Sequence, residues 1–574
     1  MELSHLIDVA AGRKPADLVF KNGSFVNVFT NTIEQADVAV AGPQIAGLGS
    51  YEGREVVDLR GGMLCPGFID AHVHIESSML SVPEFARTVV ARGTTAVVAD
   101  PHELANVMGA EGIRFILRSS KYCPIAVYVM LSSCVPASHL ESAGAELKAV
   151  DLLPFLSDPW VRGLAEIMNY PGVLSKDPDV LDKIRIVGRT PIDGHAPGLS
   201  GMDLCAYIAA GIRSDHEAST FEEGAEKLRL GMHLMIREGS AARNLDALLP
   251  LITPETLPRI MFVTDDKHVD DLVTEGHIDV MVRRAIAAGL KPAYAVRVAS
   301  FNAARYYGLH DLGAIGPGYR ANLTVLEDLK GCRVLRTYKD GELVADDGAC
   351  VAVDQSLGRP PMRLRSSINV QWLEPDNFVL PVPPGAEGRS VRIIEIIPDQ
   401  LTTHELRETP TTLDNRVVAD VQRDLLKIAV IERHSSSGNI GMGLVRGFGL
   451  KRGAIASSVA HDAHNLIVVG TNDADMLAAA VHLVKIRGGL CALADGKVLA
   501  DLPLPIAGLL SEEPAGVVVQ QLQKVRQAAR SLGSPLSHPF MTLAFMSLSV
   551  IGDLKLTDLG LADVKAFKHV ELFV

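Results

Sequence analysis

The stretch VVDLRGGMLCPGFIDAHVH, residues 56–74, decides the fold of this chain. Its second half, from Phe68 to His74, is a short apolar run that ends in a His-x-His pair, as expected for a buried strand with a polar C-terminal end. Residues i and i+2 of a strand point to the same side, so His72 and His74 can leave the strand together. The pattern therefore predicts a buried strand that presents two imidazoles at its end.

Seven more apolar runs with polar ends follow, and helical patterns such as Ser81–Arg92 and Thr220–Leu230 lie between several of them. The eight predicted strands are 68–74, 95–103, 125–133, 161–169, 190–195, 211–217, 233–240 and 259–266. Eight strand–helix units in about 245 residues match the length and rhythm of a (β/α)8 barrel. We therefore expect an α/β fold with such a barrel at its centre.

Histidines and acidic residues stand at the ends of five of these strands. They are His72, His74, Glu166, His195, His216 and Asp265. One histidine alone could be a core residue and one carboxylate alone a helix cap, but barrel enzymes build their active sites at the C-terminal ends of the strands. Four imidazoles and two carboxylates suit one or two divalent ions of the Mn, Fe or Zn type, whereas Ca²⁺ and Mg²⁺ prefer oxygen ligands. The joint pattern predicts a metal site.

The segments on either side of the predicted barrel differ from it in their sequence patterns. Short β-like runs broken by turn residues occur before and after it, and the last third alternates apolar strands with helices. Two early hairpins are expected, 17–20 with 24–29 about Asn22-Gly23 and 37–41 with 44–48. We expect three units: a discontinuous small β-sandwich domain from 1–67 and 313–362, the catalytic barrel from 68–312, and a C-terminal α/β domain from 363–574.

The composition narrows the class of function. The sums of 55 basic and 68 acidic residues give a net charge of −13, which argues against a broad nucleic-acid-binding face. The seven cysteines form no C-x-x-C pair, so no disulfide framework is expected, and a cytoplasmic compartment fits best. The N-terminal residues do not resemble a signal peptide. The uncharged stretches 122–140 and 531–552 contain prolines and histidines, so we expect no membrane span.

The quoted motifs together resemble a known family. Residues 56–74 and the segment GAIGPGYRANLTVL, 313–326, are similar to the amidohydrolase superfamily. The motifs HVHIESSM, DPHE, AEIMNYPGV, DGHAPGLSG, SDHE and TDDKH resemble those of bacterial adenine deaminases. The stretch 440–473 is similar to the C-terminal domain of that family. The resemblance covers essentially the whole chain and implies a metal-dependent barrel hydrolase.

The resemblance also implies roles for the residues at the strand ends. His72 and His74 would bind a first metal ion, and His195 and His216 a second. Glu166 would bridge the two ions, since VRGLAEIMNY contains no lysine to do so. The ions would be Mn²⁺ or Fe²⁺ in preference to Zn²⁺. Asp265 would contact the metal and the attacking water. Asp266 would fix the orientation of a metal-binding side chain without itself binding the metal.

The implied reaction is the hydrolysis of adenine to hypoxanthine and ammonia, in which a metal-bridged hydroxide attacks C6. Asp265 would carry the proton to the departing amine, and Glu217 is the candidate acid for the ring nitrogen. The residues expected near the substrate are His102, Glu103, Glu76, Ser77 and Glu238. The partner is thus a small molecule, with no nucleic acid or membrane, and the chain is expected to form a homodimer or a larger homo-oligomer.

Two alternatives stay open on the sequence. The chain could be another amidohydrolase that acts on a different purine or on a cyclic amide, or, as a different class, a catalytically inactive scaffold of the same fold. The role of the C-terminal domain is also open. Its segment His461–Asn465 is either a polar loop after a buried strand or a cover for the barrel mouth.

Overall fold

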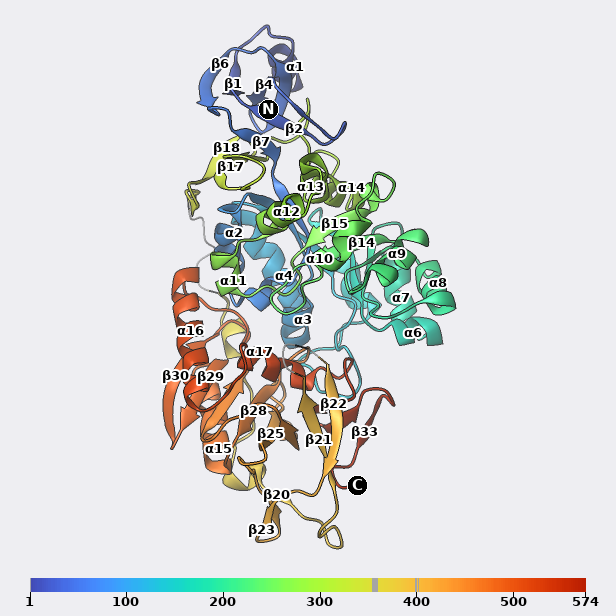
Figure 1. The fold of residues 1–574 in the computed structure, drawn as a ribbon, viewed down its shortest axis with the longest axis vertical. Coiled ribbons are helices and arrows are strands. Elements are labelled where there is room, and N and C mark those ends of the chain that lie inside the picture. Colours follow the sequence, from blue (N-terminus) through green and yellow to red (C-terminus); the bar gives the residue numbers. More distant parts are fainter. Residues whose placement is uncertain (1, 354–359, 398–399, 401) are drawn as a thin grey trace.

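The computed structural model describes residues 2–353, 360–397, 400 and 402–574. The molecule is elongated and has a β-rich part at the N-terminal end, an α/β barrel in the middle and a second α/β part at the other end (Figure 1). The segment 354–359, which falls in the expected second half of the β domain, lies outside the described residues.

The middle part is a barrel of eight short parallel strands. They are β8 (Phe68–Val73), β9 (Thr94–Ala99), β10 (Ala126–Leu131), β11 (Val161–Ile167), β12 (Ile192–Gly194), β13 (Ser214–Asp215), β14 (His233–Arg237) and β15 (Ile260–Val263). The strands pair in two sets, β12-β11-β10-β9-β8 and β13-β14-β15. A parallel bridge between Val73 and Asp265 closes one seam, and the Arg213 N–H donates to the Ile192 carbonyl at 3.0 Å across the other. The expected (β/α)8 barrel is confirmed.

Helices cover the outside of the barrel between successive strands (Figure 1). They include α2 (Val82–Val90), α3 (His102–Met108), α4 (Ala110–Ser119), α7 (Pro178–Ile186), α8 (Gly201–Ala209), α9 (Phe221–Arg229), α12 (Ile278–Ala287) and α14 (Phe301–Tyr306). Alternate strand residues such as Ile69, Val98 and Met235 fill the barrel interior, while Phe68 and Val97 pack outwards in other clusters. The alternation is interrupted near the ends of β8 and β11, where the register shifts between Asp70 and Val73 and between Leu164 and Ile167, and this lets His72 and Glu166 enter the barrel mouth.

The N-terminal part consists of two sheets. One has the order β5-β4-β1-β6 and the other β19-β18-β17-β16-β7-β2-β3. The strands are β1 (Ala16–Lys21), β2 (Ser24–Asn27), β3 (Thr32–Glu34), β4 (Asp37–Ala41), β5 (Gln44–Gly49), β6 (Gly53–Asp58), β7 (Met63–Pro66), β16 (Leu323–Leu326), β17 (Val334–Lys339), β18 (Glu342–Asp346) and β19 (Ala349–Cys350). Strands from before and after the barrel therefore share one sheet. The helix α1 (Leu3–Ala10) precedes them.

One of the two expected hairpins is wrong. β4 and β5 pair antiparallel as predicted, but β1 pairs with β4 and β6, and β2 pairs with β3 and β7. The Asn22-Gly23 segment thus carries the chain from one sheet to the other. A Cβ atom on Gly23 would lie 2.6 Å from Leu59 Cδ1, so this crossing depends on a glycine that packs closely against the loop before β7.

The C-terminal part is built on an eight-stranded sheet of order β22-β21-β26-β25-β28-β27-β29-β30. Its strands are β21 (Val391–Ile396), β22 (Thr403–Glu408), β25 (Leu425–Ile431), β26 (Ile440–Arg446), β27 (Ala454–Ser457), β28 (Leu466–Gly470), β29 (Gly489–Ala494) and β30 (Lys497–Pro503). The helix α15 (Asp473–Lys485) lies between β28 and β29. The helices α16 (Ala515–Ser531) and α17 (Pro539–Ala544) follow β30, and the small sheet β31 (Leu554–Thr557), β32 (Gly560–Asp563) and β33 (Lys568–Val570) comes last.

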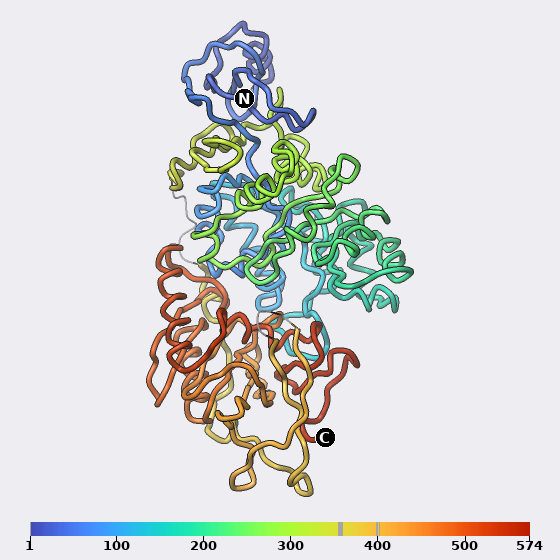
Figure 2. The backbone as a smooth tube through the Cα atoms, viewed as in Figure 1, coloured from blue at the N-terminus to red at the C-terminus, as the bar shows by residue number. Residues whose placement is uncertain are grey.

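The C-terminal part packs on the barrel (Figure 2). Leu80 bridges to Ser511, and the Ser138 and Ser549 hydroxyls lie 2.7 Å apart. One apolar cluster contains barrel residues such as Val82 and C-terminal residues such as Leu522. Across the part of the chain that the structure describes, no helix has the length and apolar character that crossing a membrane would need.

Candidate metal centre

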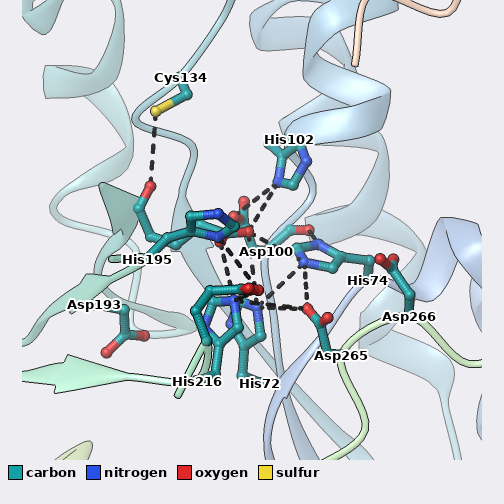
Figure 3. A network of polar contacts seen from close by, with 12 residues as sticks. His72, His74, Asp100, His102, Cys134, Asp193, His195, His216, Asp265 and Asp266 are labelled. Atoms are coloured by element: carbon teal, nitrogen blue, oxygen red, sulfur yellow. Dashed lines mark hydrogen bonds and ion pairs between the residues drawn. The ribbon is translucent and has the colours of Figure 1, made fainter. Parts of the chain in front are cut away.

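The six residues expected as metal ligands lie at the C-terminal ends of the barrel strands, and Figure 3 labels all of them except Glu166. His72 is in β8 and His74 follows it, Glu166 is in β11, and His195 and His216 come directly after β12 and β13. Asp265 lies two residues beyond β15. Five of the six are buried, and the His195 side chain is 12% exposed. The parallel strands thus bring together side chains that are far apart in the sequence.

Glu166 lies between the two pairs of histidines. Its Oε1 is 3.2 Å from His74 Nε2 and 3.8 Å from His72 Nε2. Its Oε2 is 2.7 Å from His195 Nδ1 and 3.2 Å from His216 Nε2. Each oxygen of one carboxylate therefore faces a different pair of imidazoles.

Asp265 reaches the same cluster from the end of β15, the strand that meets β8 where the barrel closes. Its Oδ1 lies 3.2 Å from His72 Nε2 and 3.0 Å from His74 Nε2, and Arg237 donates to its Oδ2 at 2.7 Å. The backbone at Asp265 has φ +56°, a left-handed conformation that aspartate and asparagine tolerate better than most residues. The Asp265 N–H donates to the His72 carbonyl, which fixes that conformation against β8.

This donor set fits divalent metal ions. The groups His72, His216, Asp265 and Glu166, His195, His216 each place their ligand atoms within 4.8 Å of one another. The Nε2 atoms of His72 and His74 are only 3.2 Å apart. Ligands that share one ion at about 2.0–2.2 Å stand roughly this far from each other. Imidazole nitrogens mixed with carboxylate oxygens favour Mn, Fe or Zn over an all-oxygen cage.

The charges in the cluster reinforce one another. Burial alone would lower the pKa of His216, but the Glu166 carboxylate outweighs it and the pKa lies well above its ordinary value. Burial alone would raise the pKa of Asp265, but Arg237 and the histidines hold it well below its ordinary value. A buried set of ionised carboxylates among imidazoles is a strong attractor for a cation.

Four other expected residues line the cavity beside this cluster, namely His102, Glu103, Glu217 and Asp266. His102 Nδ1 lies 3.0 Å from Asp100 Oδ2 and 3.6 Å from Glu166 Oε1. The Glu217 carboxylate accepts from Arg237 at 2.5 Å and lies 3.4 Å from His216 Nε2. Burial raises the pKa of Glu217, but Arg237, His195 and His216 outweigh it and hold the pKa well below its ordinary value.

Glu76 and Ser77 lie behind the residues that line this cavity. Both line a neighbouring cavity that also touches Asp266 and His461. The Leu104 N–H donates to Glu76 Oε1 at 3.1 Å, and the Ser77 hydroxyl donates to Asp266 Oδ1 at 2.5 Å. Burial and the charge of Glu103 raise the pKa of Glu76 to about 7. These two residues therefore support the cavity wall from behind.

Glu238 does not line the cavity. Arg237 ends β14 and points into the barrel mouth, so the next residue points away from it. The Glu238 carboxylate accepts from Arg284 and from the Leu245 N–H instead. The expected contact of Glu238 with a substrate stays a prediction.

Sequence reasoning gave no role to two barrel residues of the cluster. Asp100 directly follows β9 and can form a ligand group with His74, His102 and Glu166. Its position at a strand end, two residues before His102, was a usable signal. Arg237 bonds both Glu217 and Asp265. An arginine at a strand end is not a metal ligand, so nothing in the ligand pattern pointed to it.

The C-terminal part supplies the opposite wall of the cavity. This wall consists of His461, Asp462, Phe545, Leu548 and Ile551. The His461 ring stacks on Phe545 with centroids 4.5 Å apart, and His461 Nδ1 lies 3.3 Å from Glu103 Oε1. The buried Asp462 Oδ2 has no hydrogen-bond partner among the described residues. The His461–Asn465 segment thus covers the barrel mouth of its own chain.

The barrel and the ligand cluster at its mouth define an amidohydrolase, and the model of the amidohydrolase family matches residues 63–344. The model of the adenine deaminase C-terminal domain matches residues 400–568. The chain belongs to the adenine deaminase family. An adenine deaminase of Desulfatibacillum aliphaticivorans is 49% identical over 570 residues, which are 99% of each chain.

A second relative agrees with this placement. Adenine deaminase 2 of Carboxydothermus hydrogenoformans is 48% identical over 573 residues, again 99% of each chain. Among solved structures, a beta-aspartyl dipeptidase of Fervidobacterium islandicum is 16% identical with a TM-score of 0.45, and the match covers 60% of this chain and 100% of that one.

Proposed function

We propose that this protein hydrolyses adenine to hypoxanthine and ammonia. Relatives that match 99% of the chain are adenine deaminases. The observation that carries the proposal is the position of Glu166, whose two carboxylate oxygens face different histidine pairs at 2.7–3.8 Å. An inactive scaffold would not need this complete set of ligands.

We propose that two divalent cations bind here. His72, His74 and Asp265 would hold one, His195 and His216 the other, and Glu166 would serve both. Cations bound in this way lower the pKa of a water molecule towards 7 and so supply a nucleophile at neutral pH. Mn²⁺ or Fe²⁺ suits the mixed nitrogen and oxygen ligands, and Zn²⁺ is the third candidate.

Two carboxylates of the chain are assigned to proton transfer. Asp265 takes a proton from the attacking water and passes it to the amine that leaves C6, and Arg237 holds it in place through Oδ2 at 2.7 Å. Glu217 lines the cavity on the side of His216. It delivers a proton to the ring nitrogen, for which it must be protonated despite the charge of Arg237. It regains a proton from the C6 hydroxyl, the second proton of the attacking water, when the carbonyl of the product forms.

The remaining walls of the cavity suit a flat heterocycle. Phe545, Leu548 and Ile551 offer an apolar face, and His102 and Glu103 offer polar groups opposite it. The cavity has a volume of about 50 Å³, which holds a water or two but not a purine. The C-terminal wall must therefore move away from the barrel mouth when the substrate enters and close again over it.

An assay of ammonia release tests the proposal. Protein stripped of metal and reloaded with Mn²⁺, Fe²⁺ or Zn²⁺ should release ammonia from adenine and not from adenosine, because the ribose would meet the closing wall. Opening of a cyclic amide without adenine turnover would favour the other amidohydrolase function. Metal binding without activity on either substrate would favour the scaffold.

We propose a setting for this activity. All seven cysteines are free, which supports a reducing cytoplasm. A homodimer or larger homo-oligomer would cover Leu3 and Ile7, which are 71% and 50% exposed on α1. Light scattering on the purified protein tests this state.

The domain boundaries 1–67 with 313–362, 68–312 and 363–574 remain our prediction, and the sheet that β7 and β16 share supports the first of them.

A further inference from the structure

A second cavity lies at the other end of the barrel, away from the metal centre. It has a volume of about 880 Å³ and opens at the N-terminal ends of β11 to β15, where these strands begin. Its lining includes five arginines, namely Arg162, Arg189, Arg213, Arg259 and Arg305. Barrel enzymes carry out their chemistry at the opposite end, so the deaminase reaction gives this cavity no role.

These arginines form no ion pair among the described residues, although a buried carboxylate, Asp193, lies behind the lining and accepts from the Tyr306 and Tyr307 hydroxyls. Within the described residues, none of the five has a carboxylate oxygen within 4.0 Å, and the lining contains no aspartate or glutamate. Neighbouring arginines outside the lining are paired, as Arg185 is with Asp182 at 2.7 Å and Arg229 with Glu226 at 3.8 Å. A gathering of unpaired arginines is unexpected in a chain with a net charge of −13.

Neutral groups hold three of the five side chains in place. Arg162 lies over the Tyr128 ring at 4.8 Å. Arg305 lies over the Phe301 ring at 4.7 Å and also donates to the His310 carbonyl at 3.2 Å and to the Tyr319 hydroxyl, so fewer of its N–H groups are free. Arg259 donates to the Gly231 carbonyl at 2.7 Å. Such contacts orient a guanidinium without neutralising it, so its remaining N–H groups can still bind an anion.

The lining also offers hydrogen-bonding atoms that have no partner. The buried Arg162 Nε and His233 Nδ1 have no hydrogen-bond partner within the described chain. The rings of His233 and Tyr306 lie 4.6 Å apart. Burial, together with the charge of Arg259, lowers the pKa of His233 to about 4, so this ring is neutral at pH 7.

We propose that this cavity binds a small molecule that carries phosphate groups. Several guanidinium forks around one concavity match the oxygens of phosphate in geometry and in charge. The volume falls in the range of small-molecule sites. A concave site on an acidic protein favours a small anion over a nucleic acid or an acidic protein surface. The site is separate from the metal centre, so its test does not depend on deaminase activity.

Trp160 is a fluorescent reporter next to the cavity lining. It precedes the lining residues Val161 and Arg162 and stacks on Tyr128 with ring centroids 5.2 Å apart. The only other tryptophan of the sequence, Trp372, is 84% exposed and can be removed by Trp372→Phe. Titrations at constant ionic strength would use inorganic phosphate, pyrophosphate and ATP, with sodium chloride as the control.

We expect a saturable change in Trp160 fluorescence with at least one of the three phosphate compounds. The double variant Arg213→Gln/Arg259→Gln should raise its Kd at least about tenfold, because it removes two charge-assisted contacts to the phosphate oxygens. The matched control Arg229→Gln, which removes a paired arginine outside the cavity, should leave Kd unchanged. Preference for ATP over pyrophosphate would identify a nucleotide, and equal binding a free phosphate compound.

Three results would overturn the proposal. One is the lack of a saturable signal with all three compounds up to about 10 mM, a concentration at which a site with a millimolar Kd would be nearly full. Another is an unchanged Kd in a double variant whose melting temperature shows that it is folded. The third is a double variant that binds phosphate normally but changes its mass in light scattering, because the arginines would then serve self-association.

Discussion

Asp265 connects the backbone of the barrel to the proposed chemistry. Its left-handed φ of +56° turns the carboxylate towards His72 and His74, and Arg237 holds the other oxygen. Asparagine adopts the same backbone conformation readily and keeps the shape of the side chain. A change at this one position can therefore remove the proton carrier without disturbing the fold.

We expect Asp265→Asn to lower kcat for adenine by at least about 100-fold, the usual contribution of a positioned acid or base. Its melting temperature should stay within a few degrees of the wild type. Ammonia release and circular dichroism measure the two effects. A folded variant with kcat within about threefold of the wild type would exclude Asp265 as the proton carrier.

Glu166→Gln should weaken metal retention, because a neutral amide cannot balance two cations. After dialysis, elemental analysis should find clearly less metal per chain than in the wild type, together with loss of turnover. Glu226→Gln, on the surface of α9, is the matched control and should keep its metal. Wild-type metal content in Glu166→Gln would remove the bridging role.

The residues of the site could be predicted only where the signal was local. His72, His74, Glu166, His195, His216 and Asp265 were found because each ends a strand, and the structure brings all six together. Phe545 and Leu548 carry no signal in the sequence, since an apolar residue becomes part of a pocket only through packing against a distant segment. Glu238 follows Arg237 at the end of β14, and its carboxylate accepts from Arg284 and from the Leu245 N–H, so its expected contact with a substrate stays a prediction.

At the scale of elements, apolar runs identified the barrel strands but did not determine strand pairing. Asn22-Gly23 is a good local signal for a hairpin. In the structure, however, β1 pairs with β6 and β2 pairs with β7, so β1 and β2 lie in different sheets. Residues far along the chain thus decide which sheet each strand joins. The short strands β12 and β13 were identified through their polar ends rather than through β propensity.

β31 contains a buried lysine with a consequence for stability. The Lys555 ammonium donates to the Phe545 carbonyl at 2.8 Å, and burial lowers its pKa to about 7. An unfolded lysine keeps its proton to about pH 10. Between pH 7 and 10 the unfolded state therefore binds more protons than the folded state, and the free energy of unfolding rises with pH.

Lys555→Met should remove this dependence. In chemical denaturation between pH 7 and 9, the free energy of unfolding of the wild type should rise faster than that of the variant, by about 1 kcal/mol per pH unit. The exposed lysine of α16 provides the control variant Lys524→Met, which should keep the wild-type slope. Parallel slopes for the wild type and Lys555→Met would contradict the burial of an uncharged lysine.

At the scale of the molecule, the C-terminal domain completes the cavity of the barrel. The barrel and the C-terminal domain share one apolar cluster, so we expect these two parts to unfold together. Calorimetry should show one transition that contains both, and metal loading should raise its temperature because only the folded state holds the ligands together. Two well-separated transitions, with the metal affecting only one of them, would show that the C-terminal domain is an independent cover.

The most direct test of the proposed centre is anomalous diffraction from crystals of the protein loaded with Mn²⁺. We predict two anomalous peaks within bonding distance of Glu166, one beside His72 and His74 and the other beside His195 and His216. A map with no peak among these side chains, from protein that releases ammonia from adenine, would contradict the assignment of the centre.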